Sequence, residues 1–228
     1  MIASCARLLF VLALFCQTGL CAAQTEAPAP AVVPATIVIP ADTDAYAAMV
    51  RKAESGELAL DYRAMRLAYI QSGAFLRAQE RTEEFNRLKK ELIAARNASN
   101  AKGIQEAARR IMSIVYIDLG AQKLLRQSCA VLNDSACAAR YHDVEFGLLK
   151  SITASGDGKS CATGWEVVSI AEEHFMLEIL GLKFKGQQGP GDYGLCDKMT
   201  VVDEAGETRA VFFNVQAIFA GYQRLFKN

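Results

Sequence analysis

The densest group of residues able to do chemistry is the segment 155–160, SGDGKS. Its two glycines could form a backbone nest for an anion, or a loop that holds a calcium-like cation through Asp157. The glycine spacing differs from that of a nucleotide phosphate-binding loop, and a predicted helix precedes it instead of a strand. A structural interpretation is simpler and we favour it: Gly156 ends a helix, and an Asp-Gly turn follows.

A second group places two carboxylates beside an imidazole, at Glu172, Glu173 and His174. Consecutive residues of a helix point about 100° apart, so these three cannot converge on one ion or substrate. Ser169 and Glu172 also have the spacing of a capping box, which would give Glu172 a structural role. We therefore do not predict a metal or catalytic site here.

An enzyme is nevertheless the alternative function that the residues leave open. Its site would lie where the Gly156–Gly158 loop meets a small sheet, and the reaction would be that of a hydrolase or a metal-dependent enzyme. The candidate catalytic residues are Asp157, Glu173, His174 and Asp197. No Gly-x-Ser-x-Gly motif is present, and we predict no cofactor and no bound metal.

The cysteines divide into three near the N-terminus and four in the second half, at Cys129, Cys137, Cys161 and Cys196. An even number in an oxidising compartment predicts two disulfides. Of the three pairings that can be drawn, we favour the two local ones, the first two cysteines together and the last two together, because each pair then lies within one predicted substructure. A zinc site is the weaker interpretation, since no Cys-x-x-Cys occurs.

Residues 1–23 have the pattern of a secretory signal peptide. Arg7 is their only charge, an apolar run from Leu8 to Phe15 follows, and small residues lead to an expected cleavage after Ala23. The apolar run is shorter than the roughly 20 residues that span a bilayer, so an anchor helix is the weaker interpretation. We expect a periplasmic or secreted protein with no membrane span after cleavage.

Charge and length limit the remaining functions. The 228 residues contain 25 basic and 25 acidic side chains, with no basic stripe, so nothing predicts a nucleic-acid partner. Removal of the signal would leave about 205 residues, enough for one domain or two small ones. No second long apolar segment occurs, so the mature chain is expected to be soluble.

The elements that must position these residues fall into three regions. Residues 24–41 are a Pro/Ala-rich linker, in which residues 37–39 could add an edge strand. Residues 42–155 predict helical hairpins, with short loops and antiparallel neighbours. Their amphipathic pairs resemble tetratricopeptide repeats, although a strict 34-residue period cannot be aligned. Four of the expected helices span 42–56, 58–72, about 104–115 and 119–132, and two more begin at residues 82 and 135.

Residues 156–228 predict a small α+β region with a mostly antiparallel sheet and two helices. The expected strands are 165–169, 182–187, 198–203 and 208–215, the last two joined as a hairpin. The expected helices are 169–181 and 216–226. The fold class of the whole chain is therefore α+β.

Several of these segments together resemble one bacterial family, the domain of unknown function DUF4919. The resemblance covers about residues 45–225 and is carried by 60–69 (LDYRAMRLAY), 155–158 (SGDG), 167–169 (VVS), 172–174 (EEH), 180–182 (LGL), 196–197 (CD) and 212–214 (FFN). The chain departs from the family pattern at Met65, where Leu is expected, at His174, where Tyr is expected, and near Gln122, where His is expected. The resemblance implies a coherent exported fold and brings no activity.

We therefore predict a non-catalytic module that binds an envelope protein or peptide. The concave face of a helical-hairpin array commonly receives a peptide, and an exposed sheet edge can accept an extended strand. Neither mode needs a catalytic group, and the sequence contains no recognisable catalytic constellation.

Overall fold

The computed structural model describes residues 36–39, 41–191 and 194–226. The predicted signal peptide and most of the predicted linker therefore lie outside the described residues. Residues 37–39 do not form the edge strand that we expected. Ile37 is instead buried against the helices, and the Val38 backbone N–H donates to Ser113 Oγ at 2.8 Å. Ile37 and the partly buried Ile39 pack against the core, whereas Val38 is 69% exposed.

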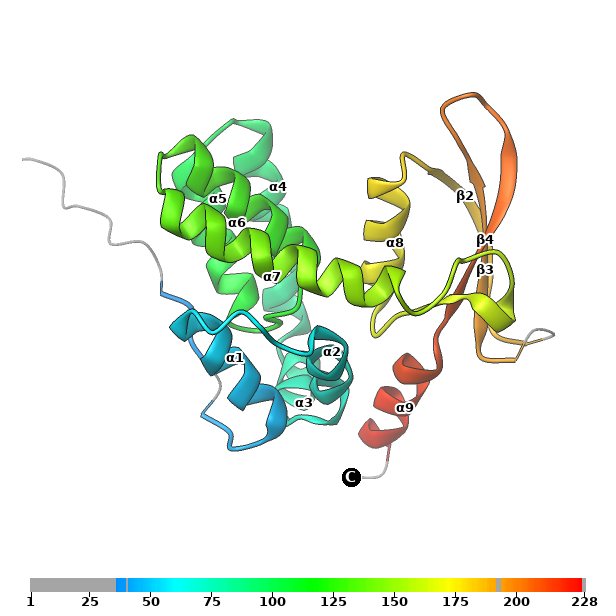
Figure 1. Ribbon diagram of the computed structural model, residues 1–228, viewed down its shortest axis with the longest axis horizontal. Coiled ribbons are helices and arrows are strands. Elements are labelled where there is room, and N and C mark those ends of the chain that lie inside the picture. The colour runs from blue at the N-terminus through cyan, green and yellow to red at the C-terminus, as the bar shows by residue number, and fades with distance from the viewer. Residues whose placement is uncertain (1–35, 40, 192–193, 227–228) are drawn as a thin grey trace, which may run out of the picture. The chain divides into compact units, whose positions relative to one another are not determined.

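The first part of the chain is helical, as predicted (Figure 1). Its helices are α1 (Ala45–Ser55), α2 (Tyr62–Gln71), α3 (Gly73–Glu80), α4 (Thr82–Asn97), α5 (Ala101–Met112), α6 (Leu119–Val131) and α7 (Ser135–Thr153). Most of them begin after a polar side chain that accepts a hydrogen bond from the first turn: Asp44, Asp61, Ser72, Asn100, Asp118 and Asp134.

Helix α3 was not predicted. We expected one helix to end at Gly73, but Ser72 takes extended backbone angles and its hydroxyl accepts from the Phe75 N–H at 3.2 Å. Ser72 therefore caps a new helix that starts at Gly73. The next helix begins at Thr82, as expected, and the Thr82 hydroxyl donates to the Gln79 carbonyl.

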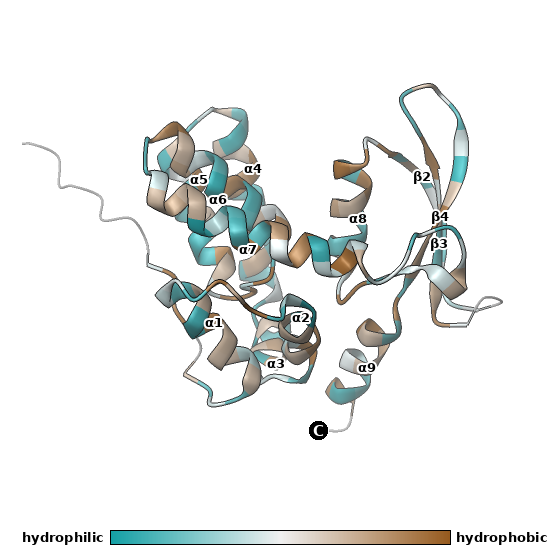
Figure 2. Cartoon of the chain, viewed as in Figure 1, coloured by the Kyte–Doolittle hydropathy of each residue, from teal (hydrophilic) through white to brown (hydrophobic). Residues whose placement is uncertain are grey.

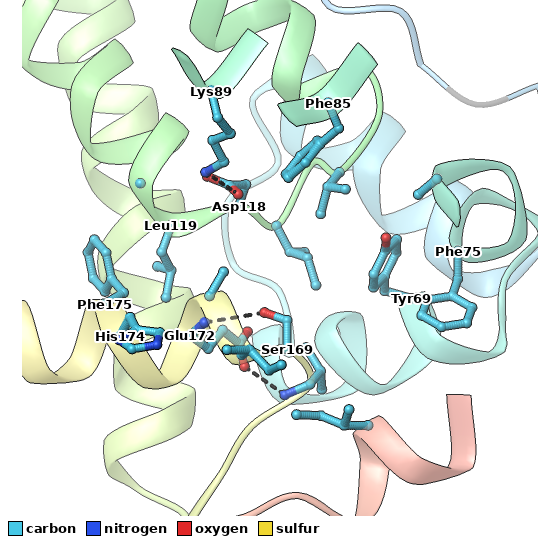
Figure 3. Close-up of a pocket in the computed structure, with 18 of the residues that line it drawn as sticks. Tyr69, Phe75, Phe85, Lys89, Asp118, Leu119, Ser169, Glu172, His174 and Phe175 are labelled. Carbon is cyan, nitrogen blue, oxygen red and sulfur yellow. Dashed lines mark hydrogen bonds and ion pairs between the residues drawn. The ribbon is translucent and has the colours of Figure 1, made fainter. Parts of the chain in front are cut away.

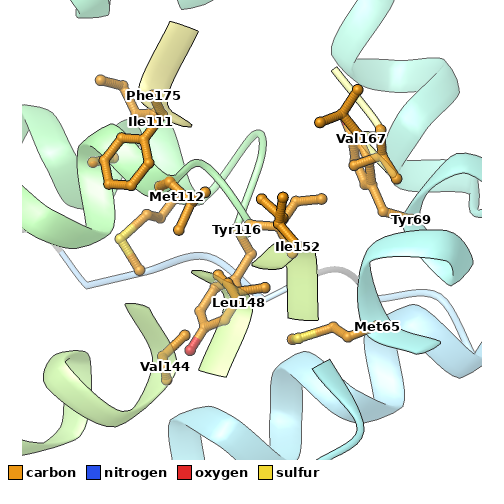
Figure 4. Packing of buried hydrophobic residues seen from close by; sticks show 14 of the residues in the cluster. Met65, Tyr69, Ile111, Met112, Tyr116, Val144, Leu148, Ile152, Val167 and Phe175 are labelled. Atoms are coloured by element: carbon orange, nitrogen blue, oxygen red, sulfur yellow. The ribbon is translucent and has the colours of Figure 1, made fainter. Parts of the chain in front are cut away.

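Helices that follow one another from α4 to α7 pack as neighbouring pairs. They carry hydrophilic and hydrophobic residues on different sides (Figure 2), and the apolar sides meet in the core (Figure 4). Fully buried members of this core include Met65, Met112, Tyr116, Leu148 and Ile152. The same cluster continues into the second part of the chain, so both predicted regions share one core.

The second part is a four-stranded sheet with two helices, which confirms the α+β class. The elements are a 3₁₀ turn (Cys161–Thr163), β1 (Trp165–Glu166), α8 (Ile170–Ile179), β2 (Lys183–Gln188), β3 (Cys196–Val202), β4 (Thr208–Asn214) and α9 (Gln216–Leu225). The strand order is β1-β4-β3-β2, with β1 parallel to β4 and the other pairs antiparallel. Strand β1 is shorter than predicted, because the chain leaves the sheet toward the α8 cap at Ser169.

Both predicted disulfides are present. Cys129 and Cys137 join the end of α6 to the first turn of α7, with their Cα atoms 5.7 Å apart. Cys161 and Cys196 join the 3₁₀ turn to the start of β3, with a Cα separation of 5.6 Å. Among the described helices, none is long and apolar enough to cross a bilayer.

A buried ion pair connects the two parts of the chain. The guanidinium of Arg66 on α2 donates from Nε and Nη2 to the two carboxylate oxygens of Glu172 on α8, at 2.8 and 2.7 Å. Its remaining donors reach the Glu166 carbonyl at 2.7 Å and Ser151 Oγ at 3.2 Å. Arg66 is 0% and Glu172 3% exposed, and the Val168 N–H also donates to Glu172. This network fixes the first turn of α8 against α2 and α7.

Replacing Arg66 with alanine should destabilise the fold by about 3–5 kcal/mol, because it leaves the Glu172 carboxylate buried without its counter-charge. The matched control is Arg63→Ala, which removes the exposed Arg63–Glu166 pair and should cost about 1 kcal/mol or less. Urea unfolding of both variants measures the difference, and equal losses would contradict the role assigned to Arg66.

Candidate functional site

A cavity of about 610 Å³ lies between helices α3 and α4 on one side and α8 and α9 on the other. Figure 3 shows Tyr69 and Phe75 on one side of it and His174 and Phe175 on the other. Its other apolar walls are Phe85, Val115, Ile117, Leu119, Val168 and Ile218. This volume lies within the range of roughly 300–1,000 Å³ that is usual for ligand sites.

Several polar groups of the cavity have no hydrogen-bond partner among the described residues. Tyr69 is 5% exposed, its hydroxyl makes no such bond, and burial raises the pKa of this phenol. The side-chain amides of Gln79 and Asn86 also line the cavity without a partner in the described chain. Gln79 is half-buried and Asn86 is exposed, so these polar groups can bond to solvent or to a ligand in the cavity.

The charges around the cavity are already neutralised within the protein. Asp118 caps α6 by accepting from the Ala121 N–H, and Lys89 Nζ donates to the same carboxylate at 2.7 Å. Glu172 pairs with Arg66 as described above, and Glu178 accepts from Lys123 Nζ at 2.8 Å. The cavity therefore combines aromatic walls with neutral hydrogen-bonding groups, which suits a ligand without net charge.

Three consecutive residues of α8 face three different parts of the molecule, as helix geometry predicts. Glu172 faces Arg66 and His174 lines the cavity, where its ring also meets Phe184 edge-on at 5.4 Å. The predicted capping box is half present: Ser169 Oγ accepts from the Glu172 N–H. The Glu172 carboxylate does not return the bond to Ser169 but accepts from the Val168 N–H.

The third residue, Glu173, faces Asp197 on β3. Glu173 is 0% and Asp197 5% exposed, and both Glu173 oxygens and one Asp197 oxygen have no donor among the described residues. Burial, and then the charge of Asp197, raise the pKa of Glu173 to about 8. The pKa of Asp197 is also raised by burial, although Gln187 donates to its other oxygen. A protonated Glu173 can donate to Asp197, whereas two carboxylates cannot hydrogen bond to each other.

The Gly156–Gly158 loop contains a tight turn, in which Gly158 has a positive φ of 68°. Gly156 does not end the preceding helix as we expected, because α7 ends at Thr153 and Ala154 is its C-cap. Asp157 is exposed and accepts from Thr163 Oγ1 at 2.6 Å and from the Lys159 N–H, and these bonds lower its pKa. A Cβ on Gly156 would lie 2.3 Å from the Thr163 carbonyl oxygen. The two glycines are thus explained by close packing and turn geometry.

The four candidate catalytic residues are not gathered at one place. Glu173 and Asp197 meet each other away from the cavity, His174 lines the cavity, and Asp157 bonds only within its own loop. Within the described ranges, no three His, Cys, Asp or Glu side chains are grouped so as to hold a metal ion. The described residues therefore present a cavity and a separate carboxyl pair.

Sequence reasoning did not find the cavity. The sequence predicts only a helix at 58–72 here, and nothing in the position of Tyr69 distinguishes a ring that lines a cavity from one in the core. Arg66 was also missed, because its partner lies 106 residues away.

Comparison with known families gives a match to the family described as Domain of unknown function (DUF4919), over residues 57–224. All of the residues named above as lining the cavity lie within this range. Neither the curated proteins nor the solved structures include a match to this chain.

Replacing Tyr69 with phenylalanine should change the unfolding free energy by no more than about 0.5 kcal/mol, because its hydroxyl has no partner within the described fold. The matched control is Tyr116→Phe, because the Tyr116 hydroxyl donates to Glu54 at 2.7 Å. That change should cost about 1.5 kcal/mol or more. Urea unfolding compares the two, and a large loss for Tyr69→Phe would show that its hydroxyl supports the fold.

Proposed function

This chain belongs to the DUF4919 family, and we propose that it is an exported, non-catalytic module that binds a peptide segment of an envelope protein. The cavity between α3–α4 and α8–α9 is the proposed binding site. The observation that carries this proposal is an apolar cavity of about 610 Å³ with polar groups that the described fold leaves unpaired.

A peptide fits the chemistry of this cavity. The rings of Phe75, Phe85 and Phe175 offer contacts to an apolar side chain, and burial of aromatic surface dominates the energetics of many interfaces. The amides of Gln79 and Asn86 each carry a donor and an acceptor, which match the two hydrogen-bonding groups of a peptide unit. A neutral cavity also selects against strongly charged small molecules.

Location in the periplasm or outside the cell is the second part of the proposal. Two disulfides support it, because such bonds persist in oxidising compartments and are rare in the cytosol. The signal-peptide pattern of residues 1–23 supports it from the sequence.

N-terminal sequencing of the protein recovered from the envelope or medium should give Gln24 as the first residue, because cleavage is expected after Ala23. Thiol titration of the same sample should detect no free thiol before reduction. Recovery of the chain from the cytosol, with Met1 or Ile2 first and its thiols free, would contradict export.

Peptide binding can be tested with a phage-displayed library of random peptides selected on the native protein. Isothermal titration then measures the affinity of the selected peptide. Ala171 lines the cavity and is exposed at the second position of α8, so Ala171→Trp should fill the site with little disturbance of the core. We expect the affinity to fall at least about tenfold, the equivalent of about 1.4 kcal/mol.

The matched control is Ala136→Trp, since Ala136 is exposed at the second position of α7. This variant should bind the selected peptide as the unmodified protein does. The proposal fails if no peptide is selected, or if both variants bind equally well. Binding of small neutral molecules in place of peptides would assign the cavity to another class of ligand.

A further inference from the structure

We propose that the buried Glu173–Asp197 pair holds one shared proton, and that loss of this proton loosens α8 and weakens binding in the cavity. This inference rests on the proposed function, because it assigns a regulation to the same site. The pair lies on the side of α8 that faces the sheet, whereas other residues of α8 line the cavity.

The first argument is burial without donors. Glu173 is 0% exposed, and neither of its oxygens accepts a hydrogen bond within the described residues. Asp197, at 5% exposure, receives one donor, the Gln187 amide, and its other oxygen has none in the described chain. Two adjacent buried carboxylates that share a single donor are costly, and a proton on Glu173 removes one charge and creates a hydrogen bond to Asp197.

The second argument is the absence of a nearby compensating cation in the described structure. The ionisable groups that face Glu173 are Asp197 on β3 and Glu172 on α8 itself, and both disfavour its negative charge. Strand β2 contributes the neutral Gln187, which donates to Asp197. The guanidinium of Arg66 is directed to Glu172 with both carboxylate oxygens occupied. A proton is therefore the simplest neutralising partner for this pair.

The third argument is the position of α8 between the pair and the cavity. Residues 168–171, together with His174 and Phe175, line the cavity. Glu173 lies between these residues in the sequence and faces the sheet. A loss of contact between Glu173 and Asp197 would therefore move or loosen the same helical turns that form the cavity wall.

The sign of the pH dependence follows from the raised pKa of Glu173, about 8 in the folded protein against 4.5 for the free side chain. When α8 opens, Glu173 returns to its ordinary pKa. The closed state thus binds one proton more than the open state between about pH 5 and pH 8. Opening should increase by up to about tenfold per pH unit in this window and level off above pH 8.

The experiment measures amide hydrogen exchange of α8 in the full-length mature protein from pH 5 to pH 9, expressed as protection factors so that the intrinsic pH effect cancels. In the unmodified protein, protection should fall by about tenfold per pH unit up to about pH 8. In Glu173→Gln, which keeps a donor toward Asp197 and cannot titrate, protection should stay constant. Glu207→Gln changes an exposed acid in the turn between β3 and β4 and should behave as the unmodified protein.

The second measurement is the affinity of the library-selected peptide at pH 6 and pH 9. It should weaken at pH 9 in the unmodified protein and stay unchanged in Glu173→Gln. Equal exchange profiles for these two proteins would overturn the shared-proton proposal, even if no peptide is found. A difference in exchange without a difference in affinity would overturn the link to the cavity.

If Glu173→Gln does not fold, Asp197→Asn provides the second variant. It removes the neighbouring charge and leaves Glu173 buried, so the pH dependence of α8 protection should persist and move to lower pH. An unchanged profile in Asp197→Asn would count against a proton shared by the pair.

Discussion

The arrangement of this protein depends on the buried contact between Arg66 and Glu172. Each ion loses several kcal/mol of hydration on burial, and only good geometry with further hydrogen bonds compensates for that loss. Here the guanidinium meets both carboxylate oxygens, and the Glu166 carbonyl and Ser151 hydroxyl occupy its other donors. Such a pair contributes little net stability compared with apolar packing, but it tolerates few alternative placements of α8. We therefore interpret it as the contact that specifies where α8 docks.

As a consequence, the short helix α8 directs side chains toward three different parts of the molecule. Successive side chains at 172, 173 and 174 reach the helical region, the sheet and the cavity. This distribution is a direct result of the angle between neighbouring helical residues. A sequence motif that looks like a catalytic cluster is thus divided among three structural tasks. Glu172 and His174 both line the cavity, but Arg66 occupies both carboxylate oxygens of Glu172.

Local signals made most of the fold predictable. Side-chain caps such as Asp61 and Asp118 and the left-handed Gly56 set helix boundaries within a few residues of those expected. Both disulfides could be predicted because each cysteine pair lies within one predicted substructure. Helix α3 was missed because Ser72 and Gly73 are equally typical of a helix end and of a new helix start. The cavity could not be predicted, because its walls come from segments as distant as Tyr69 and Tyr222, which meet only after folding.

The packing of the glycine loop has one further consequence. Trp165 is the only tryptophan of the chain, and its ring packs so closely on Gly158 that a Cβ at that glycine would lie 2.7 Å from the ring. Its indole N–H donates to the Gly156 carbonyl at 3.0 Å, and its ring centre is 5.8 Å from that of Phe213. Intrinsic indole fluorescence therefore reports on the junction between loop and sheet alone. Helices α1 to α7 contain no tryptophan, so indole fluorescence follows the second part of the chain independently of them.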